Sequence, residues 1–210
     1  MEHIGFLLKP AIDYWLLTDR FKDVAGYLDP IEGYALCLLA GLGPGNGEVV
    51  ELGSLYGRST CYLAWGCRSN GRGTVTAVDT FQGSPEHQPG QAGEQEDIRR
   101  AGSTFKTFIR NIATHGLTDW IRPWKMTSAE AAAEWQGDIR LLFIDGDHAY
   151  ESTRQDFALW TPHLAPGGAV ALHDVSTWAG VTQFYEELLA QGQWREVLSV
   201  GTVRVVQRVQ

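Results

Sequence analysis

The pattern of apolar and polar positions changes at about residue 48 of the chain. From Glu48 onward, short apolar and β-branched runs alternate with segments in which apolar residues recur at helical spacing. This alternation is typical of a parallel sheet with helices on both faces. We predict strands at Glu48–Gly53, Thr74–Asp79, Ile121–Trp124, Ile139–Asp145, Ala169–His173, Glu196–Val200 and Thr202–Gln207. We predict helices at Arg58–Ser69, Ile98–His115, Ser128–Glu134, Tyr150–Thr161 and Trp178–Gln191.

Only Gly201 separates the last two predicted strands, so we expect them to form a tight antiparallel hairpin at one edge of the sheet. The expected fold class is α/β, with a Rossmann-like doubly wound sheet of about seven strands. Most strands should be parallel, the C-terminal hairpin should be antiparallel, and helices should cover both faces.

Two segments do not follow the alternation. Residues 1–43 are rich in aromatic side chains and have a helical pattern, which suits a lid, a contact in a homodimer, or simple packing on the sheet. Residues 82–97 contain two prolines and three glycines, which favour a mobile loop that gates a site. Neither segment carries a motif that identifies an acceptor substrate.

Size and composition narrow the class of protein. A chain of 210 residues, 44% of them hydrophobic, suits one well-packed domain, with a helical segment at 1–43 and a Rossmann-like core at 44–210. The net charge of −8 argues against nucleic acid as a partner. The three cysteines lack paired C-x-x-C spacing and are expected to be free thiols. Residues 1–10 resemble neither a signal peptide nor a membrane span, so we expect a cytoplasmic protein with no membrane contact.

A glycine-containing turn follows the first predicted strand. The segment Glu51–Thr60 reads E-x-G-x-x-x-G with Ser59 and Thr60 opening the next helix, where a backbone must approach a ligand closely. This spacing is not the dinucleotide fingerprint G-x-G-x-x-G, and a glycine pair could serve the turn alone. The second strand ends in Asp79, 22 residues after Gly57, where a carboxylate can accept hydrogen bonds from ribose hydroxyls. Together the two features indicate an adenosyl ligand.

Acidic residues follow two later strands. Asp145, Asp147 and His148 come directly after one of them, and a purely structural role at the start of the next helix would also explain them. The next strand ends in His173 and Asp174. Because consecutive parallel strands commonly lie side by side, Asp145, His173 and Asp174 could converge and hold one divalent ion.

With these residues in place, the chain resembles the class I S-adenosylmethionine-dependent methyltransferases, in particular a branch that includes metal-dependent small-molecule and sugar O-methyltransferases. The resemblance covers roughly residues 48–174 and rests on the motifs V-V-E-L-G-S-L-Y-G-R-S-T, V-D-T-F-Q-G-S-P, S-A-E-A, I-D-G-D-H-A-Y-E and G-G-A-V-A-L-H-D. It implies S-adenosylmethionine as cofactor, bound by Glu51, Gly53, Ser54, Gly57, Ser59, Asp79, Thr80, Ser128, Ala129 and Asp145. Within this set, Asp79 would bind the ribose, and Ser128 and Ala129 would lie beside the adenine.

The same resemblance implies a metal bound by Asp145, His173 and Asp174, and a catalytic base at Asp147 or His148. The sequence departs from the family pattern because a His-Asp pair stands where the relatives have two carboxylates. An imidazole suits manganese, iron or zinc better than magnesium. The implied reaction is O-methylation of a hydroxylated small molecule or glycosyl group, in which the protein mainly aligns the nucleophile with the methyl group.

Two other functions remain in competition at this point. A carboxylate after the second strand also suits an NAD-dependent oxidoreductase, although the dinucleotide fingerprint and a Tyr-x-x-x-Lys pair are missing. A non-catalytic adenosyl-cofactor-binding module would keep the cofactor site without transferring a methyl group. Binding of NAD would identify the first, and cofactor binding without transfer would identify the second.

Overall fold

The computed structural model describes residues 13–209. Its single sheet contains seven strands in the order β3-β2-β1-β4-β5-β7-β6. Their bounds are β1 (Glu48–Leu52), β2 (Val75–Asp79), β3 (Ile121–Lys125), β4 (Ile139–Ile144), β5 (Leu164–Leu172), β6 (Trp194–Val200) and β7 (Val203–Arg208). The first five strands pair in parallel, and β7 pairs antiparallel with both β5 and β6. The fold class predicted from the sequence is confirmed.

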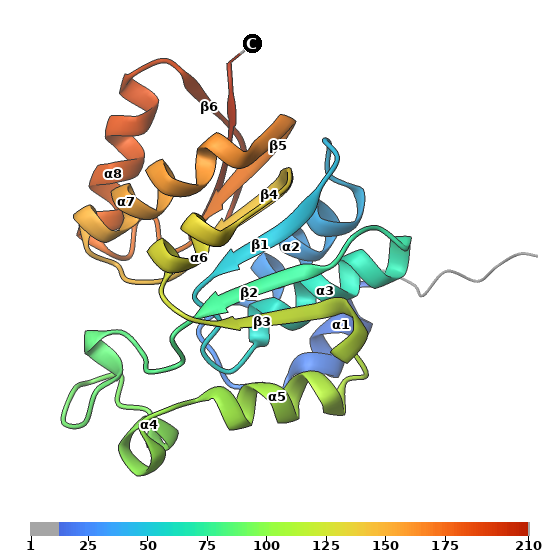
Figure 1. The fold of residues 1–210 in the computed structure, drawn as a ribbon, viewed down its shortest axis with the longest axis vertical. Helices are drawn as coiled ribbons and strands as arrows, with labels where there is room; N and C mark the ends of the chain where they lie inside the picture. Colours follow the sequence, from blue (N-terminus) through green and yellow to red (C-terminus); the bar gives the residue numbers. More distant parts are fainter. Residues whose placement is uncertain (1–12, 210) are drawn as a thin grey trace, which may run out of the picture.

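Helices cover both faces of the sheet (Figure 1). They are α1 (Tyr14–Phe21), α2 (Pro30–Leu42), α3 (Arg58–Asn70), α4 (Glu96–Ala101), α5 (Phe105–Thr114), α6 (Ser128–Glu134), α7 (Tyr150–Trp160) and α8 (Ala179–Ala190), with short 3₁₀ turns η1 (Pro85–His87), η2 (Thr118–Trp120) and η3 (Thr161–His163). Side chains of a strand alternate between faces. Val49 of β1 therefore packs with α1, α2, α3 and α5, whereas Val50 packs with α6, α7 and α8.

The order of the strands in the sheet reverses at β1. Strands β2 and β3 lie on one side of β1, and β4 and β5 lie on the other. Ligands of open α/β sheets bind at such a reversal of strand order, at the carboxyl ends of the strands. The residues that follow β1, β2, β4 and β5 are therefore placed around one crevice.

Several element boundaries differ from the predictions. The helix expected at Ile98–His115 is two helices, because Gly102 adopts a left-handed φ of 66° and its N–H caps α4 on the Ile98 carbonyl. The segment expected to be a loop, residues 82–97, contains η1 and the first residues of α4. Strand β5 begins at Leu164, five residues before its predicted start.

The described part of the N-terminal segment packs against α3 in the core, and packing within the fold is one of the roles that the sequence left open. Helix α2 lies against α3 so closely that a Cβ at Gly33 would come within 2.6 Å of the Tyr62 ring. The expectation that residues 1–10 form neither a signal peptide nor a membrane span lies outside the described residues. Within residues 13–209, no helix is long and apolar enough to cross a membrane, and Cys37, Cys61 and Cys67 are buried free thiols.

Candidate active site

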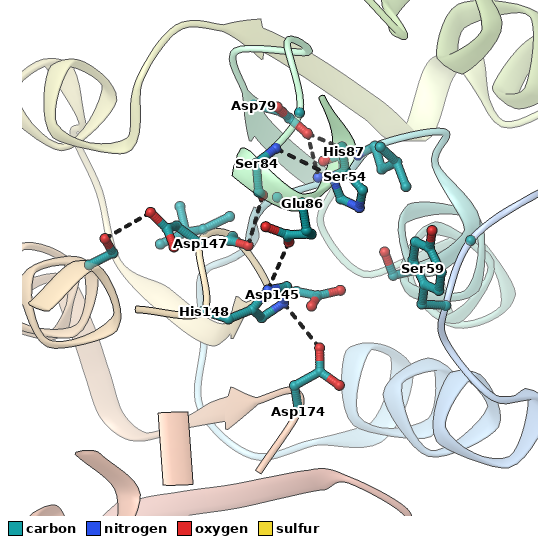
Figure 2. Close-up of a pocket in the computed structure, with 18 of the residues that line it drawn as sticks. Ser54, Ser59, Asp79, Ser84, Glu86, His87, Asp145, Asp147, His148 and Asp174 are labelled. Atoms are coloured by element: carbon teal, nitrogen blue, oxygen red, sulfur yellow. Dashed lines mark hydrogen bonds and ion pairs between the residues drawn. The ribbon is translucent and has the colours of Figure 1, made fainter. Parts of the chain in front are cut away.

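A cavity of about 1070 Å³ opens at the carboxyl ends of β1, β2, β4 and β5. The loops that follow these strands form its floor, and the segment between α1 and α2 together with η1 forms its outer wall. Figure 2 shows that acidic and imidazole side chains from separate loops point toward one another here. The cavity lies where the strand order reverses, as expected for a ligand site in this class of fold.

The loop after β1 depends on glycine at two positions. Gly53 has φ 88°, and a Cβ there would lie 2.0 Å from the carbonyl oxygen of Asp145, so only glycine allows the loops after β1 and β4 to meet. Gly57 also has φ 88° and directly precedes α3, where a Cβ would press on the Phe108 ring. Gly53 lines the cavity, whereas Gly57 shapes the start of the helix without lining it.

Glu51 supports this loop from below. Its side chain is fully buried, and its Oε2 accepts hydrogen bonds from the Ser54 hydroxyl at 2.7 Å and from the Thr60 hydroxyl. Burial raises the pKa of Glu51 to about 7, although these hydroxyls act in the opposite direction. Glu51 does not line the cavity. The structure thus gives Glu51 a supporting position beneath the loop, and its contact with a cofactor stays a prediction.

Asp79 joins the first two loops of the site. Its Oδ2 accepts from the backbone N–H groups of Ser54 at 2.8 Å and Leu55 at 2.9 Å, and its Oδ1 accepts from that of Phe81 at 2.6 Å (Figure 2). A carboxylate offers about four lone-pair sites, so one remains for a ligand in the cavity. Asp79 therefore both shapes the loop and faces the ligand space.

His173 is buried between acidic side chains from different elements. Its Nδ1 lies 2.8 Å from Asp145 and 3.4 Å from Asp174, and its Nε2 lies 3.3 Å from Glu32 of α2. Burial lowers the pKa of this imidazole, but the surrounding carboxylates outweigh burial and the pKa is raised. Both ring nitrogens are thus engaged by protein carboxylates, and His173 does not line the cavity.

His148 takes the position beside the acids that the sequence assigned to His173. Its Nε2 lies 3.0 Å from Asp174 and its Nδ1 lies 3.0 Å from Glu86 of η1 (Figure 2). The Trp178 ring stacks on it at a centroid distance of 4.5 Å. Burial lowers the pKa of His148, but the hydrogen bond with Asp174 and the charge of Asp145 raise it overall.

Asp145, His148 and Asp174 form the group that could hold a metal ion in the described part of the chain, since each offers a ligand atom and these atoms lie within 4.8 Å of one another. The sequence pattern predicts His173, in place of His148, as the third metal ligand. Its ring instead turns toward Phe143 and Glu32, on the α2 side of the sheet, because side chains alternate along a strand and its extension.

Asp147 begins α7. Its Oδ1 accepts from the Ala149 N–H at 3.0 Å and its Oδ2 accepts from the Ser152 hydroxyl at 3.1 Å. This arrangement is the structural role that the sequence left open for the residue. Asp147 nevertheless lines the cavity, so its remaining lone pairs are accessible to a bound molecule.

The loop after β3 closes the far end of the cavity. Thr127 caps α6 through a reciprocal pair of contacts with Glu130, and Ser128 accepts a hydrogen bond from Trp160 Nε1 at 2.9 Å. Asp156 of α7 lies beside this end, and burial raises its pKa to about 6 while the Ser128 side chain lowers it.

Eleven of the predicted site residues line the cavity: Gly53, Ser54, Ser59, Asp79, Thr80, Ser128, Ala129, Asp145, Asp147, His148 and Asp174. Sequence reasoning missed Glu32, Glu86, Asp156 and Trp178, which also line it. Glu32, Glu86 and Trp178 come from segments without a motif, so only the packed fold brings them to the site. Asp156 lies about two turns after the start of α7. Nothing in the helical pattern of the sequence marks a carboxylate at that position as a site residue.

The comparison with protein families agrees with this geometry. Residues 50–175 match the model of a family described as a methyltransferase domain. The chain belongs to this methyltransferase family. The resemblance to class I S-adenosylmethionine-dependent methyltransferases is thereby confirmed.

One curated relative is an uncharacterized protein, y4gI, of Sinorhizobium fredii, which is 33% identical over 151 residues. The match covers 68% of this chain but only 15% of the relative's length. The function of the relative as a whole therefore does not transfer to this chain.

Solved structures with the same fold include several O-methyltransferases. The O-methyltransferase NovP is 22% identical with a TM-score of 0.66, covering 94% of this chain and 100% of that one. TomG of Streptomyces achromogenes, solved with S-adenosylmethionine, is 15% identical with a TM-score of 0.63 (98% and 93% covered). An O-methyltransferase of Bacillus cereus, solved with S-adenosylhomocysteine, is 17% identical with a TM-score of 0.61 (96% and 93% covered). At these identities the likeness concerns the fold.

Proposed function

We propose that the protein is an S-adenosylmethionine-dependent O-methyltransferase that acts on a neutral hydroxylated small molecule with the help of a divalent metal. The observation that carries the proposal is a single cavity that joins the glycine loop after β1 to the Asp145, His148 and Asp174 group. The glycine loop suits an adenosyl cofactor, and the group of three side chains suits a cation that binds an acceptor oxygen.

The charge of the cavity wall supports this choice of ligands. Among the described residues, its only lysine or arginine is Arg58, against eight carboxylates: Asp29, Glu32, Asp79, Glu86, Asp145, Asp147, Asp156 and Asp174. Such a wall favours a cationic sulfonium and a metal ion, and it repels anionic acceptors. We therefore infer an acceptor without phosphate or carboxylate groups.

The three candidate ligands fit a divalent ion of intermediate softness. Two carboxylates and one imidazole leave positions open for an acceptor, and the imidazole favours manganese over magnesium. A bound ion would supply positive charge to an acceptor hydroxyl and lower its pKa. Because His148 belongs to the ligand set, we assign acceptance of the hydroxyl proton to Asp147, whose carboxylate faces the same cavity.

Calorimetry tests the cofactor and the metal separately. We expect S-adenosylhomocysteine to bind the purified protein, and Mn²⁺ to bind with an affinity that Asp174→Asn reduces by about 10-fold or more. Asp119→Asn, an exposed residue of η2, is the matched control and should change neither affinity. Absence of S-adenosylhomocysteine binding would refute the cofactor assignment, and an unchanged Mn²⁺ affinity in Asp174→Asn would refute the metal site.

A transfer assay tests the reaction itself. Methyl-labelled S-adenosylmethionine should yield labelled product with some member of a panel of neutral polyols, phenols and glycosides, and Mn²⁺ should increase the rate. Cofactor binding without transfer to any acceptor would favour a binding module, and NAD binding in its place would favour an oxidoreductase.

A further inference from the structure

We propose that Asp156 recognises the exocyclic amine of the adenine ring and so makes the site selective for adenosyl over other purine cofactors. The inference rests on the proposed function, because it assigns a residue to the cofactor that this function requires. Asp156 lies on α7, outside all the motifs that carry the family resemblance.

The position of Asp156 places its carboxylate between two loops of the cavity. It lines the cavity together with Met126, Ser128 and Ala129 from the loop after β3. Its Oδ2 would lie 3.6 Å from a Cβ at Gly146, in the turn after β4. Because Gly146 has no side chain, nothing from that residue stands between the carboxylate and the cavity.

The surroundings of this carboxylate suit a flat ring. Val78, Met126 and Ala129 supply apolar surface at the same end of the cavity. Ala129 has no polar side-chain atom, so it cannot bind the amine of a purine through its side chain. The Ser128 hydroxyl accepts from Trp160 Nε1 and lies beside Asp156, which fixes the serine as a neighbour of the carboxylate.

The other carboxylates nearby already accept hydrogen bonds from the loops that hold them. Asp147 accepts hydrogen bonds at the start of α7, and Asp79 accepts three backbone N–H groups. Among the hydrogen bonds of the described residues, none from a backbone N–H reaches Asp156. A partly buried carboxylate that lines an apolar cavity end is stabilised by an N–H donor of the ligand. The adenine amine is such a donor.

The hypoxanthine analogue of S-adenosylhomocysteine tests this assignment, because a ring carbonyl replaces the amine. An acceptor-only carboxylate rejects that carbonyl, whereas the amide of Asp156→Asn can donate to it. By calorimetry at pH 8, wild-type protein should prefer the adenine form by about 10-fold or more. Asp156→Asn should reduce the preference to within roughly 3-fold.

Glu151→Gln is the matched control, since it removes one carboxylate from the exposed face of the same helix. It should keep the wild-type preference. Equal affinity of wild-type protein for the two forms, or an undiminished preference in Asp156→Asn with S-adenosylhomocysteine still bound, would overturn the role of Asp156. Failure of wild-type protein to bind S-adenosylhomocysteine at all would overturn the proposed function as well.

Discussion

Glu51 shows how a single buried residue can support the loop after β1. Its carboxyl group is wholly enclosed, and hydroxyl groups of Ser54 and Thr60 bind one of its oxygens. Burial gives the folded protein a Glu51 pKa of about 7, above the ordinary value of 4.5. The folded state therefore holds this proton more tightly than the unfolded chain does.

The consequence for stability has a definite sign. The contribution of Glu51 is fully present below pH 4.5 and is lost as pH rises through about 7. Glutamine cannot ionise. We therefore expect the free energy of unfolding of Glu51→Gln to rise relative to that of wild-type protein by up to about 1.4 kcal/mol for each pH unit in that window. Denaturant unfolding of both proteins at pH 5, 6, 7 and 8 measures the difference. Parallel stability curves for the two would contradict the pKa shift.

Residue types near the strand ends were predictable, but their orientations were not. Asp79, Asp145 and Asp174 reach the cavity because they lie at, or within two residues of, the carboxyl ends of parallel strands. His173 follows a strand equally closely, yet it points to the other side of the sheet, and His148 from the loop after β4 takes its place. Side-chain alternation along β5 and its extension orients His173. The turn after β4 places His148, and the geometry of that turn is not encoded in strand periodicity.

At the scale of elements, α2 is connected to the C-terminal hairpin through Glu32. The side chain is buried, and its Oε1 accepts from the Thr202 N–H at 2.6 Å and from the Thr202 hydroxyl at 2.9 Å. Its Oε2 accepts from the Asp29 N–H at 2.9 Å and lies near His173. One carboxylate thus joins the N-terminal segment, the end of β5 and the β6–β7 turn.

Removal of that carboxylate should weaken the whole assembly. We expect Glu32→Ala to lower the free energy of unfolding by about 3–5 kcal/mol, since it leaves buried backbone and hydroxyl donors without an acceptor and the Nε2 atom of His173 without a partner. Glu32→Gln keeps an acceptor oxygen and should cost less. Urea unfolding of the three proteins provides the test, and an alanine variant within about 0.5 kcal/mol of wild type would show that the contact carries no stability.

The sequence predicted the alternation of elements but not all of their limits. The break at Gly102 was missed because a single glycine inside a helical pattern is tolerated in many helices, and here its left-handed φ ends α4. The N-terminal segment had no strand or loop signal that could place Glu32 against a turn 170 residues later. Contacts of this kind depend on packing of the complete fold.

At the scale of the whole molecule, the cavity collects much of the protein's negative charge. The chain has a net charge of −8. Among the described residues, the cavity wall contains eight carboxylates and one arginine, Arg58, with no lysine. This negative electrostatic potential acts on a charged ligand before the ligand contacts the protein, and a cleft strengthens the potential. Selection of the acceptor is therefore partly a property of the entire wall.

The wall should discriminate between acceptors that differ only in charge. For any neutral acceptor that the panel identifies, we expect a derivative with one added carboxylate to have a kcat/KM lower by about 10-fold or more. The difference in kcat/KM between the two acceptors should decrease as the salt concentration is raised, because salt screens charge. Steady-state kinetics with the matched pair provides the test. Equal kcat/KM values for the two would show that the wall does not select by charge.

The bond between Glu32 and Thr202 also bears on how the protein is made. A ribosome releases the amino end first, at about 5–20 residues per second, so Glu32 emerges roughly 10–30 s before its partner. The two residues are 170 positions apart. During that interval the nascent chain can form β1 and α3, yet the carboxylate has no hairpin turn to bind. Completion of this wall of the cavity must therefore await the synthesis of β6 and β7.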